Sequence, residues 1–301
     1  MGAWRSKSER RPAGRRRGVA RTAAIIACAA ALAMSLVVAG CGAEVGPTET
    51  IRIDEPLASA AVTDVELVMG AGSLSITPGA TGLVSGIIRC NVEDWQPQIR
   101  RSDTRLLIQQ KSRDAISGLE TAVINEWGLQ LGQSPMRLRI SAGAYDAALD
   151  LSGLTLQDLS IEDGASQTQV MFNSPNPGQM ERLWFKTGAS AVSLIGLANA
   201  NFKSMQFTGG AGTFTFDFSG QLRTKATAKI VLGTGTVRIQ VPASTAVVVK
   251  AIGSQIAVDT QGTWVTKGQT HSTPAVAANK DGKVLTVELE MGAGTATLVA
   301  K

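Results

Sequence analysis

The chain has 301 residues, of which 44% are hydrophobic, 18% charged and 4% aromatic. This is the composition of a folded protein, and it excludes a largely disordered chain. The formal net charge is +5, but residues 1–40 hold eight of the 29 Lys and Arg and one of the 24 Asp and Glu. The rest of the chain therefore carries 21 basic and 23 acidic residues, which argues against a nucleic-acid-binding surface.

The first 40 residues have the parts of an export signal. A cationic stretch ends at Arg21, and the uncharged run from Thr22 to Gly40 follows. A cationic region followed by an apolar region and small residues is typical of a segment removed on export. We therefore predict a signal peptide over residues 1–40. The alternative is an uncleaved anchor helix, because this run nearly matches the thickness of a bilayer.

The run ends in Val38-Ala39-Gly40-Cys41 and is followed by Gly42. This motif resembles the lipobox of bacterial lipoproteins. The resemblance implies cleavage between Gly40 and Cys41, and a diacylglyceryl thioether on Cys41 as the mature N-terminus. Two acyl chains hold a protein stably on a membrane, whereas one chain is marginal. The expected location is the extracytoplasmic face of the cell membrane, with the lipid bilayer as the partner of acylated Cys41.

Cysteine usage leaves no pair for an internal disulfide. Cys28 leaves with the signal and Cys41 is consumed by lipid, so only Cys90 remains. We expect Cys90 to be a small buried apolar residue. A reactive or intermolecular thiol is the alternative.

Residues 41–62 carry Pro47, Pro56 and mixed charge without an apolar stripe, which predicts a flexible tether. Residues 63–301 are expected to form the folded domain. Within it, residues 91–136 depart from the repeat described next. Arg105 to Ile108 is a candidate strand, and the remainder is expected to be an irregular insertion with a short helix.

One template recurs along this domain. VELVMGAG at Val65–Gly72 and VELEMGAG at Val287–Gly294 agree at seven of eight letters. Around the first glycine of each, apolar residues stand at offsets −5, −3, +4 and +6, and the same template surrounds other glycines. The template glycines are Gly70, Gly143, Gly164, Gly188, Gly210, Gly233 and Gly292.

Alternating apolar residues on both sides of each glycine indicate strands. The inward-facing parity changes at the glycine, so we expect the chain to turn a corner there with a positive φ. Repeats of about 20–24 residues predict an all-β fold, a single-chain β-solenoid of glycine-cornered coils. A sandwich of hairpins is the alternative. The two matching phrases are expected to mark a coil near each end of the stack.

The segments DLSGLTLQDLSIEDGAS, PNPGQMERLWFKTGAS and FTGGAGTFTFDFSGQL also carry a family resemblance. They are similar to toast-rack domains of bacterial envelope proteins, including candidate adhesins and proteins near the cell-wall-antibiotic response proteins. The resemblance covers roughly residues 62–301. It implies a β-solenoid on the outer side of a membrane, with no catalytic residues to transfer.

Few residues suggest chemistry. Asp150 and Asp217 each stand seven residues after a template glycine, three coils apart, which is roughly 14 Å. Glycosidase carboxylates lie about 5–9.5 Å apart, so turn capping is expected instead. The lone His271 excludes a multi-histidine zinc site and leaves only a weak candidate catalytic base. No metal or other cofactor is expected.

Four tryptophans are candidates for stacking on sugars: Trp95, Trp127, Trp184 and Trp264. Trp184 stands between the core positions Leu183 and Phe185, so its side chain should project outward.

The expected function is that of a membrane-anchored extracytoplasmic binding lipoprotein of the bacterial cell envelope. It would be adhesin-like, without catalysis, and would bind another envelope protein or a wall glycan. One alternative is an accessory or sensor protein of an envelope-stress response. A polysaccharide-active solenoid enzyme is a further alternative, for which the sequence offers no cluster of acids on adjacent coils.

Overall fold

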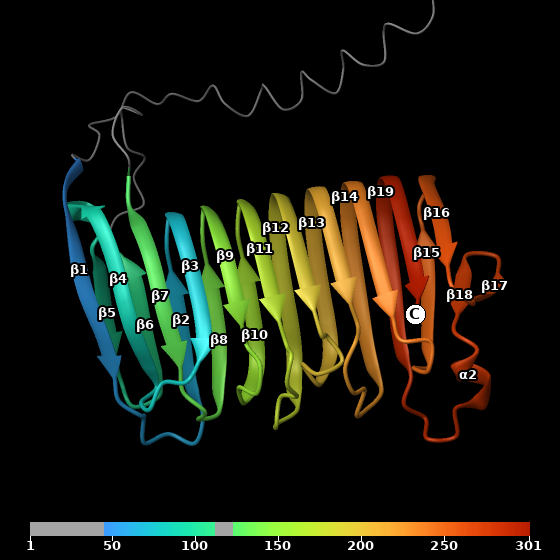
Figure 1. The fold of residues 1–301 in the computed structure, drawn as a ribbon, viewed down its shortest axis with the longest axis horizontal. Coiled ribbons are helices and arrows are strands. Elements are labelled where there is room, and N and C mark those ends of the chain that lie inside the picture. The colour runs from blue at the N-terminus through green and yellow to red at the C-terminus, as the bar shows by residue number, and fades with distance from the viewer. Residues whose placement is uncertain (1–44, 112–122) are drawn as a thin grey trace, which may run out of the picture. The chain divides into compact units, whose positions relative to one another are not determined.

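A computed structural model of the protein describes residues 45–111 and 123–301. These residues lie in one compact unit of strands that stand side by side in a row (Figure 1). The all-β, β-solenoid-like fold predicted from the glycine-cornered repeats is confirmed. In the described ranges no helix is long and apolar enough to cross a membrane. The short helices there are η2 (Glu93–Trp95) and α2 (Ala275–Ala278).

Each coil consists of two strand segments that meet at a corner and contribute to opposite sheets. In several coils the two segments are separate strands: β2 (Thr63–Val68) with β3 (Ala71–Pro78), β8 (Met136–Ser141) with β9 (Ala144–Asp150), and β10 (Leu156–Glu162) with β11 (Ala165–Met171). In others one strand runs through the corner: β12 (Met180–Ile195), β13 (Phe202–Asp217), β14 (Ala226–Val241) and β19 (Leu285–Ala300). Neighbouring coils pair in parallel, as a solenoid requires.

The predicted change of parity is present at the corner. In β12, Leu183 and Phe185 face the interior before Gly188, and Val192 and Leu194 face it afterwards. The interior between the two sheets is apolar and continuous along the stack. At its centre the ring of Phe207 lies 4.9 Å from that of Phe216 and 5.2 Å from that of Phe185, measured between centroids.

The order of coils in space differs from their order in sequence. The coil of β2 and β3 lies between β8–β9 on one side and the pair β6 (Arg105–Gln110) and β7 (Asn125–Leu131) on the other. Strand β19 likewise lies between β14 and the pair β15 (Val247–Ile252) and β16 (Gln255–Gln261). The two matching phrases therefore stand next to the outermost parallel coil on either side, each between two parallel neighbours.

The predicted tether is wrong for the part of it that the structure describes. Residues Val45–Glu55 form β1, which pairs antiparallel with β4 (Val84–Val92). The segment alternates Ile51, Ile53 and charged residues, and Ile53 is fully buried. The segment forms a strand because it pairs with the edge of β4, and this pairing outweighs the turn-forming composition of the stretch.

The expected insertion at 91–136 is also largely wrong. Arg105–Gln110 is a strand, as predicted, but β6 and β7 together make a full coil, with β5 (Pro97–Arg101) beside β6. The template did not identify this coil because its two strands, which end at Gln110 and begin at Asn125, are not joined through a single template glycine. The helix expected in this region falls mainly on residues 112–122, outside the described part.

Short strands finish the far end of the stack. β18 (Thr270–Ser272) pairs antiparallel with β15, and β17 (Val265–Lys267) pairs antiparallel with β18. The other end likewise carries antiparallel strands, since β4 pairs antiparallel with β7. The interior of the stack is thus parallel and its two ends are antiparallel.

Candidate binding surface

The template glycines form a ladder along the corner. The amide of Gly143 donates to the carbonyl of Gly70 over 2.7 Å, and the amide of Gly164 donates to the carbonyl of Gly143 over 2.9 Å. A Cβ on any later member would lie 2.3–2.9 Å from the carbonyl oxygen of the preceding glycine; these members are Gly143, Gly164, Gly188, Gly210, Gly233 and Gly292. The glycines are therefore structural, as predicted, and the close approach of two backbones excludes a side chain.

The predicted positive φ at these glycines is wrong. Positive φ occurs two residues later, at Gly72, Gly212, Gly235 and Gly294, where φ lies between +134° and +154°. At these positions a Cβ would lie 1.8–2.1 Å from a backbone oxygen of a neighbouring coil, so both the conformation and the close approach require glycine there. At the end of the ladder, the amide of Gly70 donates to Oε1 of Gln110 over 2.9 Å, so a side-chain oxygen takes the place of a glycine carbonyl.

A polar cluster is enclosed just inside the corner of the middle coils. Asp163 is 5% exposed, and its Oδ1 accepts hydrogen bonds from the hydroxyls of Thr187 and Ser190. Its Oδ2 is buried and has no hydrogen-bond partner among the described residues. Burial raises the pKa of this carboxyl, and the hydroxyl donors oppose that rise.

The candidate carboxylate pair is not an acid–base pair. Asp150 and Asp217 occupy the same register three coils apart, separated by Met171 and Ile195. Oδ1 of Asp150 accepts from the amide of Ser152 over 3.0 Å, and Oδ1 of Asp217 accepts from the amide of Ser219 over 2.8 Å. The predicted turn caps are confirmed.

His271 lies on β18 and is 8% exposed. Its Nδ1 is 3.1 Å from the hydroxyl of Thr266, and burial lowers its pKa. The described residues contain no group of three or more His, Cys, Asp or Glu side chains arranged to hold a metal ion.

Cys90 is a free, buried cysteine, as predicted. Burial raises the pKa of its thiol, and the nearby carboxylate of Glu49 adds to that rise. Gly40 and Cys41, the predicted cleavage and lipidation residues, lie outside the described part of the chain.

The tryptophans divide by environment. Trp95 and Trp127 are buried, and Nε1 of Trp127 donates to Oδ1 of Asn125 over 2.8 Å. Trp264 is half-buried and donates to the carbonyl of Gln261 over 3.1 Å. Trp184 is half-buried on the outer surface between buried Leu183 and Phe185, so the predicted outward projection is confirmed.

The sheet that carries Trp184 presents rows of charged side chains. We call its outer surface over β2, β8, β10 and the first halves of β12, β13, β14 and β19 the charged face. Ion pairs join neighbouring coils across it: Arg137 with Asp64, Arg182 with Asp158, Lys186 with Glu162, and Lys229 with Glu290. Exposed pairs of this kind contribute little to stability, about 0–1 kcal/mol each. They hold the charged side chains in fixed rows.

The opposite sheet is different in chemistry. One of its outer rows contains Ser73, Gln167, Thr213, Thr236 and Thr295 on successive coils, interrupted by Asp146 and Ala191. Small uncharged polar residues predominate there. The two faces of the stack therefore differ in charge.

A shallow depression of about 420 Å³ lies on the charged face, and Ser160 is among the residues that line it. In register across the strands, Ser160 has Arg139 on one side and Trp184 on the other. Along its own strand it is flanked by Asp158 and Glu162, whose side chains pair with Arg182 and Lys186. Ser160 is only 9% exposed, so a small side chain forms the floor between larger walls.

Arg139 differs from the other cations around this depression. Its side chain is exposed, and no described residue forms a hydrogen bond or an ion pair with its guanidinium. The neighbouring Glu66 carboxylate pairs with Arg105 instead. The depression therefore contains one cation whose charge is not neutralised by a described acid.

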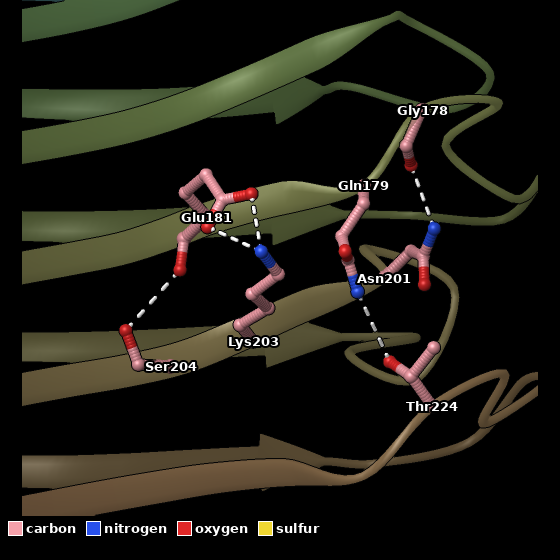
Figure 2. A network of polar contacts seen from close by, with 7 residues as sticks. All are labelled: Gly178, Gln179, Glu181, Asn201, Lys203, Ser204 and Thr224. Carbon is pink, nitrogen blue, oxygen red and sulfur yellow. Dashed lines mark hydrogen bonds and ion pairs between the residues drawn. The ribbon is translucent and has the colours of Figure 1, made fainter.

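Polar contacts also fix the turns at the edge of the charged face. Lys203 Nζ lies 2.6 and 2.7 Å from the two carboxylate oxygens of Glu181 on the preceding coil (Figure 2). Beside this pair, Nδ2 of Asn201 donates to the carbonyl of Gly178 over 2.7 Å. These contacts tie the coil of β13 to the coil of β12 at this edge.

Sequence reasoning predicted the outward position of Trp184 but missed Arg139, Ser160 and the ion-pair rows. The sequence signal for the ion pairs was the recurrence of oppositely charged residues one repeat apart. Arg182 follows Asp158 by 24 residues, and Lys186 follows Glu162 by 24.

Part of the chain is similar to a known domain family. Residues 42–181 match the family model of the N-terminal domain of toast_rack, DUF2154. This segment is therefore similar to the toast-rack N-terminal domain, which supports the predicted resemblance over the first part of its expected range. A comparison with curated proteins gave no match.

Two solved structures are similar over most of this chain. A candidate cell adhesion protein from Clostridium sporogenes ATCC 15579 is 19% identical, with a TM-score of 0.45, over 85% of this chain and 99% of that chain. A candidate adhesin from Bacteroides fragilis NCTC 9343 is 9% identical, with a TM-score of 0.33, over 84% and 97%.

Proposed function

We propose that this protein is a lipid-anchored, adhesin-like binding protein on the extracytoplasmic face of a bacterial membrane. The observation that supports the binding role best is the charged face, a flat surface on which paired charges stand in rows around a depression with an unneutralised arginine. Fixed outward side chains on stacked coils provide an extended recognition surface. The turn-capping roles of Asp150 and Asp217 favour binding over catalysis.

The anchor is proposed from the leader and the motif at Cys41. Strand β1 begins at Val45, four residues after Cys41. Four residues of extended chain span at most about 14 Å. An acylated Cys41 would therefore hold this end of the stack close to the membrane surface rather than on a long tether.

Membrane fractionation of Cys41→Ser tests the anchor. We expect the full-length variant to lose its lipid and to leave the detergent-phase fraction in which the unmodified protein is found. Cys28→Ser is the matched control, because it changes a cysteine in the leader and should leave acylation unchanged. Metabolic labelling with a clickable fatty acid should mark the parent and Cys28→Ser but not Cys41→Ser.

Full retention of an unprocessed Cys41→Ser chain, with no fatty-acid label on the parent, would support the uncleaved anchor helix instead. The partner is tested separately by photo-crosslinking in intact cells from Gln206 on the charged face, with Thr236 on the opposite face as the control position. A wall glycan or envelope protein captured only from Gln206 supports the binding role. Capture of a membrane signalling protein would favour the envelope-stress alternative.

A further inference from the structure

We propose that the depression around Ser160 binds a sugar ring that carries an anionic group, with Arg139 binding the anion and Trp184 stacking on the ring. This inference rests on the proposed binding function and names its ligand class. The anion is a carboxylate or a phosphate, since both suit the planar donors of a guanidinium.

The charge of the site points to an anionic ligand. The depression is lined by Glu66, Glu162, Arg139 and Arg182. Both glutamates are paired with cations, Arg105 and Lys186, and Arg182 is paired with Asp158. Arg139 is left with a free set of donors among the described residues, so an added anion meets an unneutralised cation without displacing an ion pair.

The aromatic wall points to a ring. Trp184 is half-buried and leaves part of its side chain uncovered on the outer surface. One face of a pyranose ring consists mainly of C–H bonds, and such a face packs on an indole while the hydroxyls remain in water. The next residue in this row after Trp184 is Gln206, whose amide can hydrogen-bond to sugar hydroxyls.

The spacing of the row suits one ring. Arg139, Ser160 and Trp184 lie on three neighbouring parallel strands. Strands are about 4.8 Å apart, so the two outer residues stand roughly 10 Å apart at their backbones, with Ser160 between them. A second depression, of about 430 Å³, shares Glu66, Arg139, Ser160 and Arg182 and extends toward Arg105. A polymer of rings can therefore continue across the face.

A peptide carboxylate fits this position less well. Strands β8, β10 and β12 each pair with a strand on both sides, so their backbone groups are used within the sheet. An extended peptide commonly binds a β-sheet by adding a strand to its open edge, and the depression lies away from the edges of this sheet. Recognition here depends on side chains alone, which favours a ring over an extended backbone.

The test is calorimetric titration of the full chain in detergent micelles. The probes are an oligogalacturonate, its methyl ester, and a phosphorylated dextran. We expect the oligogalacturonate or the phosphorylated dextran to bind, and the neutral methyl ester to bind at least about tenfold more weakly. Binding of the first probe but not the third identifies a carboxylate, and the reverse result identifies a phosphate.

Variants then assign the residues. Arg139→Gln should weaken binding of the anionic probe about tenfold or more, and should reduce the preference over the methyl ester. Trp184→Ala should weaken binding of both charged and neutral rings, and Trp184→Phe should recover part of the loss. Arg238→Gln, which removes a half-buried cation from the opposite face, is the matched control and should bind like the parent.

Both substituted side chains project from the sheet surface, so the variants should fold, and an unchanged circular dichroism spectrum checks this. Equal binding of the anionic probe and its ester, or unchanged binding by Arg139→Gln and Trp184→Ala, overturns the proposal. Binding of an acidic peptide in place of all three probes overturns the ligand class. None of these outcomes depends on fractionation of Cys41→Ser, so failure of the anchor and failure of the sugar site remain distinguishable.

Discussion

The amide of Gly143 lies 2.7 Å from the carbonyl oxygen of Gly70, although β3 to β8 separate the two residues in sequence. This contact repeats in the glycine ladder, where each glycine packs against the backbone of the preceding coil. The corner is therefore set by backbone contact between coils.

Gly188→Ala should lower the free energy of unfolding by about 2–4 kcal/mol, because its Cβ would lie 2.3 Å from the carbonyl oxygen of Gly164. Urea denaturation of the full chain in detergent measures this. Gly128→Ala is the control. The Cβ at that exposed strand position meets nothing closer than 3.6 Å, so stability should change little. Equal effects of the two substitutions would contradict the ladder as a steric constraint.

Asp163→Asn should change how stability depends on pH. Burial raises the pKa of this carboxyl in the folded state above its unfolded value. The folded state therefore binds the proton more tightly, and the stability associated with this group falls as pH rises from the usual carboxyl range through the raised pKa. A side-chain amide at this position cannot titrate, so the variant should lose this decline and be at least as stable as the parent at neutral pH.

Denaturation of Asp163→Asn at a series of pH values provides the measurement. Asp146→Asn, at an exposed position on β9, is the matched control and should follow the parent curve. Asp163→Ala should be less stable than Asp163→Asn by about 1–3 kcal/mol, because the hydroxyls of Thr187 and Ser190 lose their acceptor. Parallel pH curves for the parent and Asp163→Asn would argue against a titrating carboxyl at this site.

Phe207→Ala should destabilise the fold by about 3–5 kcal/mol. The ring is fully buried and contacts the rings of Phe185, Phe214 and Phe216. Thermal unfolding followed by circular dichroism tests this, and Phe207→Leu should cost clearly less because it leaves a smaller cavity. If the two variants unfold together, the aromatic cluster is not a principal part of the core.

Cys90 should react with a thiol reagent on the order of a hundredfold more slowly in the folded protein than in urea. The thiol is buried, and its raised pKa reduces the thiolate fraction. Ile53→Ala in β1 should accelerate labelling, because β1 covers the edge of β4 on which Cys90 lies. Rapid labelling of the folded parent would show that β1 opens readily.

The interior coils could be predicted from sequence because each of them packs between two similar coils and therefore repeats the same apolar template around its glycine. The two end coils could not, since their corners differ. In the coil of β15 and β16, Ser254 stands opposite Gly292 and the glycine falls one position earlier, at Gly253. In the coil of β6 and β7, Gln110 supplies the acceptor through its side chain.

The candidate site was predictable only in part. Alternation places Trp184 outside, because it stands between two core residues. Arg139 has no ion-pair partner among the described residues because Glu66, its neighbour across the strands, pairs with Arg105 from β6. That strand joins the stack out of sequence order, so the repeat spacing alone gives no indication of the pairing.

The placement of β19 between β14 and the β15–β16 coil has a consequence for proteolysis. Loss of Leu285–Ala300 would not shorten the stack by a terminal coil. It would remove a strand from the interior of the stack, so β14 and β15 would lose the strand that pairs with both of them. Core residues that pack against β19, such as Ile230 and Val249, would then be exposed. If β19 is removed after a cut just before Leu285, the coil of β15 and β16 is therefore expected to lose its contact with the rest of the stack, although it remains joined to β14 through the chain.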